Sequence, residues 1–203
     1  MVDTGNSLLE GIAKQFNNPN HADVEIYIGQ YELPAHSIIL ASQSLFFQIA
    51  LNGKFREGKD KKLYFTEGSA HAHWRVFEYM YTSDYADEPA QALHAIDDNE
   101  LVKHVRVYVT AEYFMINSLK QLALKRFKAE LDKGWADEFL VDCIREVYES
   151  TTESDLGLRR AVIETAYKYR ADLWEVEVFR DLVCDGGDFV VDLMRELIWR
   201  EIS

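Results

Sequence analysis

Cysteine, proline and glycine are all scarce in this chain, which has 2 Cys, 3 Pro and 10 Gly among 203 residues. Cys143 and Cys184 lie far apart in segments with a helical pattern, which excludes a disulfide framework and fits a reducing compartment. The first residues lack the basic start and apolar run of a signal peptide. We therefore expect a cytoplasmic protein, a nuclear protein, or one found in both places.

Positive charge is also under-represented, with 22 Lys and Arg against 35 Asp and Glu, for a net charge of −13. Such a field repels phosphate backbones and anionic lipid, so direct nucleic-acid and membrane partners are not expected. The short basic run at residues 59–62 is interrupted by Asp60, and we interpret it as a solvated turn. Hydrophobic residues make up 48% of the chain, enough for one good core or two small ones.

Motifs of catalysis are missing as well. No nucleophile elbow, His-Glu-x-x-His pair or phosphate-binding glycine loop occurs. His71 and His73 stand two positions apart on a predicted helix, point in different directions, and are predicted to be exposed at the start of that helix. The acidic pair Asp97–Asp98 is interpreted as a helix cap or solvated turn. We predict no catalytic residue, no cofactor and no metal site, and hence no enzyme.

The apolar periodicity predicts a mixed α and β fold. One face of a first helix carries Leu8, Leu9, Ile12 and Phe16, and that face is predicted with equal weight to pack on its own domain or on a second copy. Period-two alternation predicts a hairpin at 24–28 and 31–33, with a turn at Gly29–Gln30 and a break at Pro34. Two compact helices over 38–50, with Ser42 and Ser44 as caps, and a third strand at 63–65 follow.

Helices dominate the rest of the chain. Patterns at 74–81, 101–114 and 117–131 predict one helix each, and only helical stripes follow Gly134. Gly186–Gly187 is predicted to separate the last two helices. The fold class is therefore α+β, with a small sheet near the N-terminus and an all-helical C-terminal region.

Five segments in a fixed order resemble the BTB/POZ family: residues 23–29, 33–47, 55–58, 63–65 and 77–85. This resemblance implies a BTB/POZ fold, a small sheet flanked by helices, followed by a helical extension like that of fungal and adaptor-type members. It divides the chain into a dimerisation helix at 1–20, a BTB/POZ domain at 21–132 and a helical C-terminal extension at 133–203. Such a protein is a protein-interaction module.

Two polar residues of the resembling segments, Asp23 and His36, are expected to hydrogen-bond the backbone and fix the start of the helices. His36 is thus predicted to be structural. Many family members have a basic residue after this histidine that helps to form a pocket for transcriptional corepressors. Ser37 stands there in this chain, so a corepressor role through that pocket is not expected, and no zinc-finger spacing is present.

The tripeptide Phe55-Arg56-Glu57 resembles the hydrophobic-x-Glu motif of cullin-binding BTB adaptors. The resemblance implies a homodimeric adaptor that links a partner to a cullin-RING ubiquitin ligase, with Phe55 and Glu57 contacting the cullin N-terminal domain. Leu8, Leu9, Ile12 and Phe16 would form the dimer interface. Two alternatives stay open: Phe55 could belong to its own core, and the protein could be a scaffold that only self-associates. No kelch or MATH module is recognisable, so no client is predicted.

Overall fold

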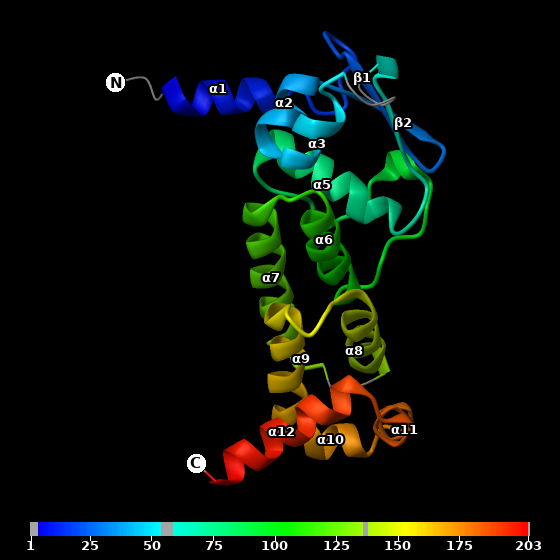
Figure 1. Ribbon diagram of the computed structural model, residues 1–203, viewed down its shortest axis with the longest axis vertical. Helices are drawn as coiled ribbons and strands as arrows, with labels where there is room; N and C mark the ends of the chain where they lie inside the picture. Colours follow the sequence, from blue (N-terminus) through cyan, green and yellow to red (C-terminus); the bar gives the residue numbers. More distant parts are fainter. Residues whose placement is uncertain (1–3, 54–58, 136–137, 203) are drawn as a thin grey trace. The chain divides into compact units, whose positions relative to one another are not determined.

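The computed structural model describes residues 4–53, 59–135 and 138–202. The chain forms two compact units, Met1–Asp98 with Arg106–Gln121, and Asn99–Val105 with Leu122–Ser203. Figure 1 shows the strands in the first unit and helices throughout the second. The predicted order, a small sheet with helices followed by a helical region, is confirmed. The domain boundaries at residues 20 and 132 stay predictions.

The sheet of the first unit has three strands in the order β2-β1-β3. β1 (Val24–Ile28) pairs antiparallel with β2 (Tyr31–Ala35) and parallel with β3 (Lys62–Phe65). Gly29 makes the hairpin turn with φ of +59°, a conformation that side chains disfavour. β2 continues through Pro34, where we predicted a break, because an edge strand tolerates a residue without an N–H donor.

Among the described residues, six α-helices contribute to this first unit: α1 (Thr4–Ala13), α2 (Ser37–Gln43), α3 (Leu45–Ala50), α5 (Ala70–Thr82), α6 (Val102–Tyr113) and α7 (Asn117–Leu131). A 3₁₀ turn, η1, covers Gln91–Leu93. Ser44 separates α2 from α3, and its hydroxyl accepts a hydrogen bond from the Phe47 backbone N–H, as expected of an N-cap. Ser42 does not cap a helix, because its hydroxyl donates to the Ile39 carbonyl.

Aromatic rings fill the core of the first unit. Phe114 lies at the centre, with its ring centroid 4.9 Å from that of Phe47, 5.2 Å from Phe65 and 5.9 Å from Phe77. Phe47, Phe77 and Phe114 are fully buried. The Ser44 hydroxyl donates to the Phe114 carbonyl at 2.7 Å, which ties the start of α3 to the end of α6. Burial of these rings therefore fixes the positions of α3, β3, α5 and the end of α6 together.

The second unit is helical in the part that the structure describes. Its helices are α8 (Glu138–Ser150), α9 (Leu156–Lys168), α10 (Arg170–Trp174), α11 (Glu177–Asp185) and α12 (Asp188–Ile202), with the C-terminal half of α7. The core uses one stripe of each long helix, including Ile144, Val162 and Leu193. Gly186 and Gly187, both at positive φ, separate α11 from α12, as predicted. Within the described ranges, no helix is long and apolar enough to cross a bilayer.

Candidate partner-binding surfaces

A groove of about 710 Å³ lies beside β3, at the surface of the first unit. We call it the β3 groove. Four of its large side chains, Ile49, Tyr64, Tyr113 and Met115, are 49–62% exposed. The full set of lining residues is Phe46, Ile49, Ala50, Asp60, Lys62, Leu63, Tyr64, Phe65, Tyr113 and Met115. A hollow lined largely by apolar and aromatic side chains is the kind of surface that binds a partner's anchor residues.

Local conformation explains why these side chains face outward. α3 turns Phe47 into the core, so Ile49 on its other face stays half exposed. Tyr64 alternates with the buried Leu63 along β3 and reaches the outer face of the sheet. Met115 follows α6 in the left-handed conformation, with φ of +58°, and its side chain is exposed between the buried Phe114 and Ile116. A non-glycine residue held at positive φ stores backbone strain, which is common at functional surfaces.

Charged and hydroxyl groups form one rim of the β3 groove. The Lys62 ammonium lies 2.5 Å from the Glu25 carboxylate, which also accepts a hydrogen bond from the Tyr27 hydroxyl. The hydrogen bond from Lys62 lowers the pKa of Glu25, and the same contact raises the pKa of Lys62. Tyr27 stacks on Tyr64 with ring centroids 4.7 Å apart. The rim therefore offers a flat aromatic surface with both charges beside it.

The predicted cullin-contact residues, Phe55 and Glu57, lie outside the described residues, so their contacts stay a prediction. Their neighbours in sequence are informative. Ala50, before the tripeptide, and Asp60, after it, both line the β3 groove. Our sequence reasoning assigned neither Tyr64 nor the Tyr113–Met115 segment to a surface. The available signal was the run Tyr113-Phe114-Met115, three large apolar residues at a predicted helix end, where one helical face cannot bury all of them.

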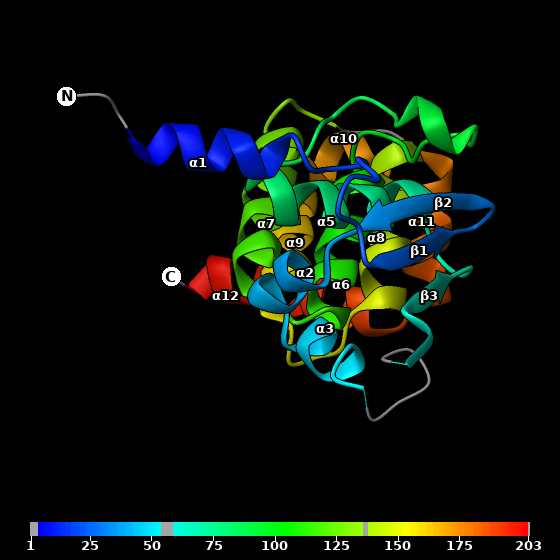
Figure 2. The same ribbon diagram turned by 90° about the horizontal axis from the view of Figure 1, so that it is seen from above.

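α1 presents a second apolar surface. Leu8 and Leu9 are 68% and 59% exposed, and Ile12 is partly buried. Both ribbon views show α1 projecting from the rest of the first unit at its N-terminal end (Figure 2). Phe16 follows the helix, and its ring contacts Trp74 and Tyr81 at centroid distances of 5.0 and 5.7 Å. Phe16 thus anchors α1 to its own unit, while the role of all four residues in a dimer stays a prediction.

Asp23 and Ser37 contact each other at the start of α2. The Asp23 carboxylate accepts hydrogen bonds from the Ser37 N–H at 2.7 Å and from the Ser37 hydroxyl at 2.6 Å. Partial burial acts to raise the pKa of Asp23, but the bonds from Ser37 outweigh it, and the pKa is lowered. The carboxylate therefore caps the helix.

His36 fully uses its ring nitrogens in structural contacts. Nε2 contacts the Asn20 carbonyl at 2.9 Å and so carries the proton, while Nδ1 accepts from the Tyr81 hydroxyl at 3.0 Å. The same hydroxyl accepts from the His36 N–H, and burial raises the pKa of Tyr81 to about 12. Both nitrogens are engaged with neutral partners, so the predicted structural role of His36 is confirmed.

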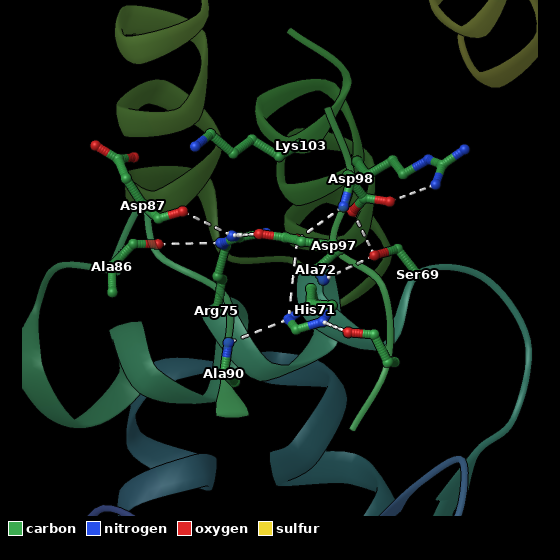
Figure 3. A network of polar contacts seen from close by, with 12 residues as sticks. Ser69, His71, Ala72, Arg75, Ala86, Asp87, Ala90, Asp97, Asp98 and Lys103 are labelled. Atoms are coloured by element: carbon green, nitrogen blue, oxygen red, sulfur yellow. Dashed lines mark hydrogen bonds and ion pairs between the residues drawn. The ribbon is translucent and has the colours of Figure 1, made fainter. Parts of the chain in front are cut away.

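A network of polar contacts connects α5 to the segment that precedes α6 (Figure 3). The buried Arg75 guanidinium forms two bonds to the Asp97 carboxylate, at 2.9 and 2.5 Å, and donates to the Ala86 and Asp87 carbonyls. Burial acts to raise the pKa of Asp97, but the contacts with Arg75 prevail and lower it. The network fixes a long irregular segment, 83–98, by satisfying its buried polar groups.

Two predictions about this region are wrong. His71 and His73 are 2% and 8% exposed, whereas we expected exposed residues at a helix start. His71 donates from Nε2 to the Ala95 carbonyl, and His73 contacts the Ser69 carbonyl through Nδ1. The acidic pair also has a different role: Asp97 binds Arg75 and Asp98 binds Arg106, while Asn99 caps the start of α6. The basic partners lie eight or more residues away, so the local pattern did not reveal them.

The structure shows little that resembles a reaction centre. Within the described ranges, no group of three or more His, Cys, Asp and Glu is placed to hold a metal ion. Cys143 is buried, and burial raises the pKa of its thiol, which disfavours the thiolate. The titratable groups of the β3 groove rim, Glu25 and Lys62, are held in their charged forms by one another.

Comparison with known proteins places the chain in a family. A model of the BTB/POZ domain matches residues 12–130, more than half of the chain, and the protein belongs to the BTB/POZ family. Its BTB/POZ domain is a protein-interaction module. Kelch-like protein 38 of Mus musculus is 27% identical over 97 residues, which are 48% of this chain and 17% of the mouse protein. Kelch-like protein 38 of Rattus norvegicus is 26% identical over 97 residues, which are 48% of this chain and 17% of the rat protein.

Solved BTB domains also resemble this chain. The BTB domain of zebrafish PATZ1 has a TM-score of 0.48 and 17% identity, over 64% of this chain and 95% of that one. The BTB domain of human Gigaxonin has a TM-score of 0.45 and 18% identity, over 62% and 92% of the two chains. The present chain matches less than a fifth of the length of each curated relative.

Proposed function

We propose that this protein is a homodimeric adaptor that links a partner protein to a cullin-RING ubiquitin ligase, and that the β3 groove binds the cullin N-terminal domain. The observation that carries the proposal is the position of the groove. Its lining residues Ala50 and Asp60 lie five residues before Phe55 and three residues after Glu57 in the sequence.

The chemistry of the groove supports a helical partner. An amphipathic helix buries large apolar side chains at positions i, i+3, i+4 and i+7, and needs an apolar trough with polar edges. Ile49 and Met115 supply aliphatic surface and Tyr113 an exposed aromatic ring, while Glu25 and Lys62 lie at the rim. Aromatic residues in such a trough commonly carry most of the binding energy. Cullin N-terminal domains are built of helices, so this geometry fits the class of partner that the motif implies.

The homodimer part of the proposal rests on α1. Leu8 and Leu9 expose most of their surface on a helix whose base is held by Phe16. Pairing two such helices would remove these side chains from water, at roughly 25 cal/mol per Å² of apolar surface. The alternative is a scaffold that only self-associates. It is supported by the same leucines but gives no role to the β3 groove.

Capture with an immobilised cullin N-terminal domain tests the adaptor proposal. Wild type should be recovered, and recovery should fall at least about tenfold for Phe55→Ala/Glu57→Lys and for Ile49→Lys, because each loses a hot spot. Ile96→Lys is the matched control, since Ile96 is 98% exposed and lies outside the groove. Equal recovery of wild type and the motif variant, or recovery of neither, would reject the site.

Light scattering tests the dimer separately. Wild type should have the mass of at least two chains at tens of micromolar, and Leu9→Lys should reduce this mass because it places a charge in the proposed α1 contact. A wild-type monomer would count against both the homodimer and the self-association scaffold. Loss of cullin capture in a variant that keeps its dimer mass would separate the two contacts.

A further inference from the structure

The outer face of α12 is apolar, which is unusual for the solvent side of a surface helix. Val191, Met194, Ile198 and Ile202 follow each other at spacings of 3, 4 and 4 residues and are 50–80% exposed. Trp199, 70% exposed, lies beside them. We call these five residues the α12 stripe. Single exposed apolar residues are ordinary, but a contiguous row on one helix marks an interaction surface.

The opposite face of α12 is already occupied, so the stripe cannot turn inward. Phe189 and Leu193 are buried against the neighbouring helices of the second unit, and the Phe189 ring contacts those of Tyr148 and Phe179. The Tyr148 hydroxyl donates to the Asp192 carboxylate at 2.9 Å. The buried Arg159 guanidinium reaches Asp188 at 3.4 Å and holds the first turn. These contacts fix the rotation of α12 about its axis and leave the stripe facing solvent.

We propose that the α12 stripe binds the α12 stripe of a second copy of this chain, with the two helices antiparallel. The spacing of the stripe carries the proposal. Its four aliphatic residues are 3, 4 and 4 positions apart in one chain direction and 4, 4 and 3 apart in the other, so the row looks nearly the same when the helix is reversed. A two-fold axis near residue 196 places Met194 opposite Ile198 of the second copy, and Val191 opposite Ile202. Every residue of the row then meets an apolar partner, as a self-complementary two-fold contact requires.

The flank of the stripe also favours a second copy. Arg195 and Trp199 lie on the same side, one turn apart, so the same two-fold axis brings each guanidinium near the indole of the other chain. Guanidinium and indole attract each other when the cation lies over the ring. The Arg195 guanidinium lies 2.8 Å from the Asp192 carboxylate, and the arginine side chain is 74% exposed. The guanidinium therefore keeps an open side toward a partner.

Charge opposes this contact, so the apolar stripe has to outweigh it. The whole chain carries a net charge of −13. α12 carries four acidic residues, Asp188, Asp192, Glu196 and Glu201, and two arginines, Arg195 and Arg200, which gives the helix a net charge of −2 in each copy. Both arginines are paired within the helix, with Asp192 and Glu196, and salt screens the repulsion that remains.

This contact differs from the α1 dimer and goes beyond the proposed adaptor function. Two distinct two-fold contacts on one chain, α1 and α12, join copies into an open series in place of a closed pair. The protein would then assemble beyond the dimer as its concentration rises. Self-association through α12 alone gives a dimer even if α1 does not pair.

Sedimentation equilibrium of the full chain in reducing buffer tests the proposal. Protein concentrations from about 1 to about 100 µM cover the range in which a contact through a single helix face is expected to dissociate. Ile198→Lys should weaken association through α12 at least about tenfold, while Ile96→Lys should leave the mass unchanged. In a Leu9→Lys background, the protein should still form a dimer, and adding Ile198→Lys should give a monomer. If only the α1 proposal fails, Leu9→Lys alone has no effect and Ile198→Lys alone gives the monomer.

A charge exchange tests the antiparallel register. Met194→Lys and Ile198→Glu should each weaken association, and the double variant should recover it, since each lysine then faces a glutamate of the second copy. A parallel pair would place like charges opposite each other and would not recover. An unchanged mass in Ile198→Lys, or a Leu9→Lys protein that is monomeric over the whole concentration range, would overturn the proposal.

Discussion

The β3 groove and the α12 stripe are both exposed and apolar, but they are built differently. The groove combines α3, β3 and the end of α6, segments that are up to 70 residues apart in sequence and are joined by one buried ring cluster. The stripe comes from one helix, and only the rotation of that helix decides whether it faces solvent. A surface made from distant segments depends on the core beneath it, whereas a helix stripe depends on the packing of the opposite face.

The largest expected effect is in the core below the groove. Phe114→Ala removes the ring that contacts Phe47, Phe65 and Phe77, and should lower the free energy of unfolding by about 3–5 kcal/mol. Cullin capture should be lost with it. Urea unfolding and capture measure both effects. Phe179→Ala, a buried phenylalanine of the second unit, is the matched control and should leave capture intact.

Removal of Arg75 should have the next largest effect. Arg75→Met leaves the Asp97 carboxylate and two backbone carbonyls without their buried donor, which should cost about 3 kcal/mol in unfolding free energy. Thermal and urea unfolding measure this loss. Arg195→Met breaks an exposed ion pair and should cost at most about 0.5 kcal/mol. Similar losses in both variants would show that the network of Figure 3 contributes no special stability.

Ser44→Ala should have an intermediate effect that links stability to the groove. The hydroxyl caps α3 and donates to the Phe114 carbonyl, so its loss should cost about 1–2 kcal/mol. Because the second bond ties α3 to the end of α6, cullin capture should weaken as well. Ser42→Ala, two residues earlier and without a capping bond, is the control. A lower unfolding free energy with unchanged cullin capture would mean that the groove does not depend on the hydrogen bond between Ser44 and Phe114.

The smallest expected effect on stability is in the stripe itself. Ile198→Lys exposes no new cavity and should change the unfolding free energy by no more than about 0.5 kcal/mol at concentrations where the chain is monomeric. Urea unfolding at low protein concentration measures this. A loss of several kcal/mol would show that Ile198 belongs to the core of the second unit, and the contrast between groove and stripe would fail.

Local patterns predicted much of the fold. The alternation in 24–28 gave β1 with its buried face, and the turn at Gly29 fixed the hairpin. The helix start at Asn117 or Ser118 and the break at Gly186–Gly187 were also predicted, and α7 begins at Asn117. These features depend on neighbours within a few residues, so they are visible in the sequence.

The groove and the Arg75 network could not be predicted, because they depend on contacts between distant residues. His71 and His73 looked exposed from their helix position. The segment 83–98, held by Arg75 and Asp97, contacts His71 through Ala90 and Ala95, whereas His73 packs against the rings of Phe65 and Phe114. Met115 resembles an ordinary core residue in sequence. It is exposed where the backbone turns to the left-handed conformation after α6, a turn that the apolar pattern does not reveal.

Calorimetric titration of the full chain with a cullin N-terminal domain tests the central claim most directly. We expect wild type and Ile96→Lys to bind with the same affinity, and Ile49→Lys and Tyr113→Ala each to bind at least about tenfold more weakly, with unchanged unfolding curves. Equal affinity of all four proteins, or no binding by wild type, would contradict the assignment of the β3 groove as the cullin-binding surface.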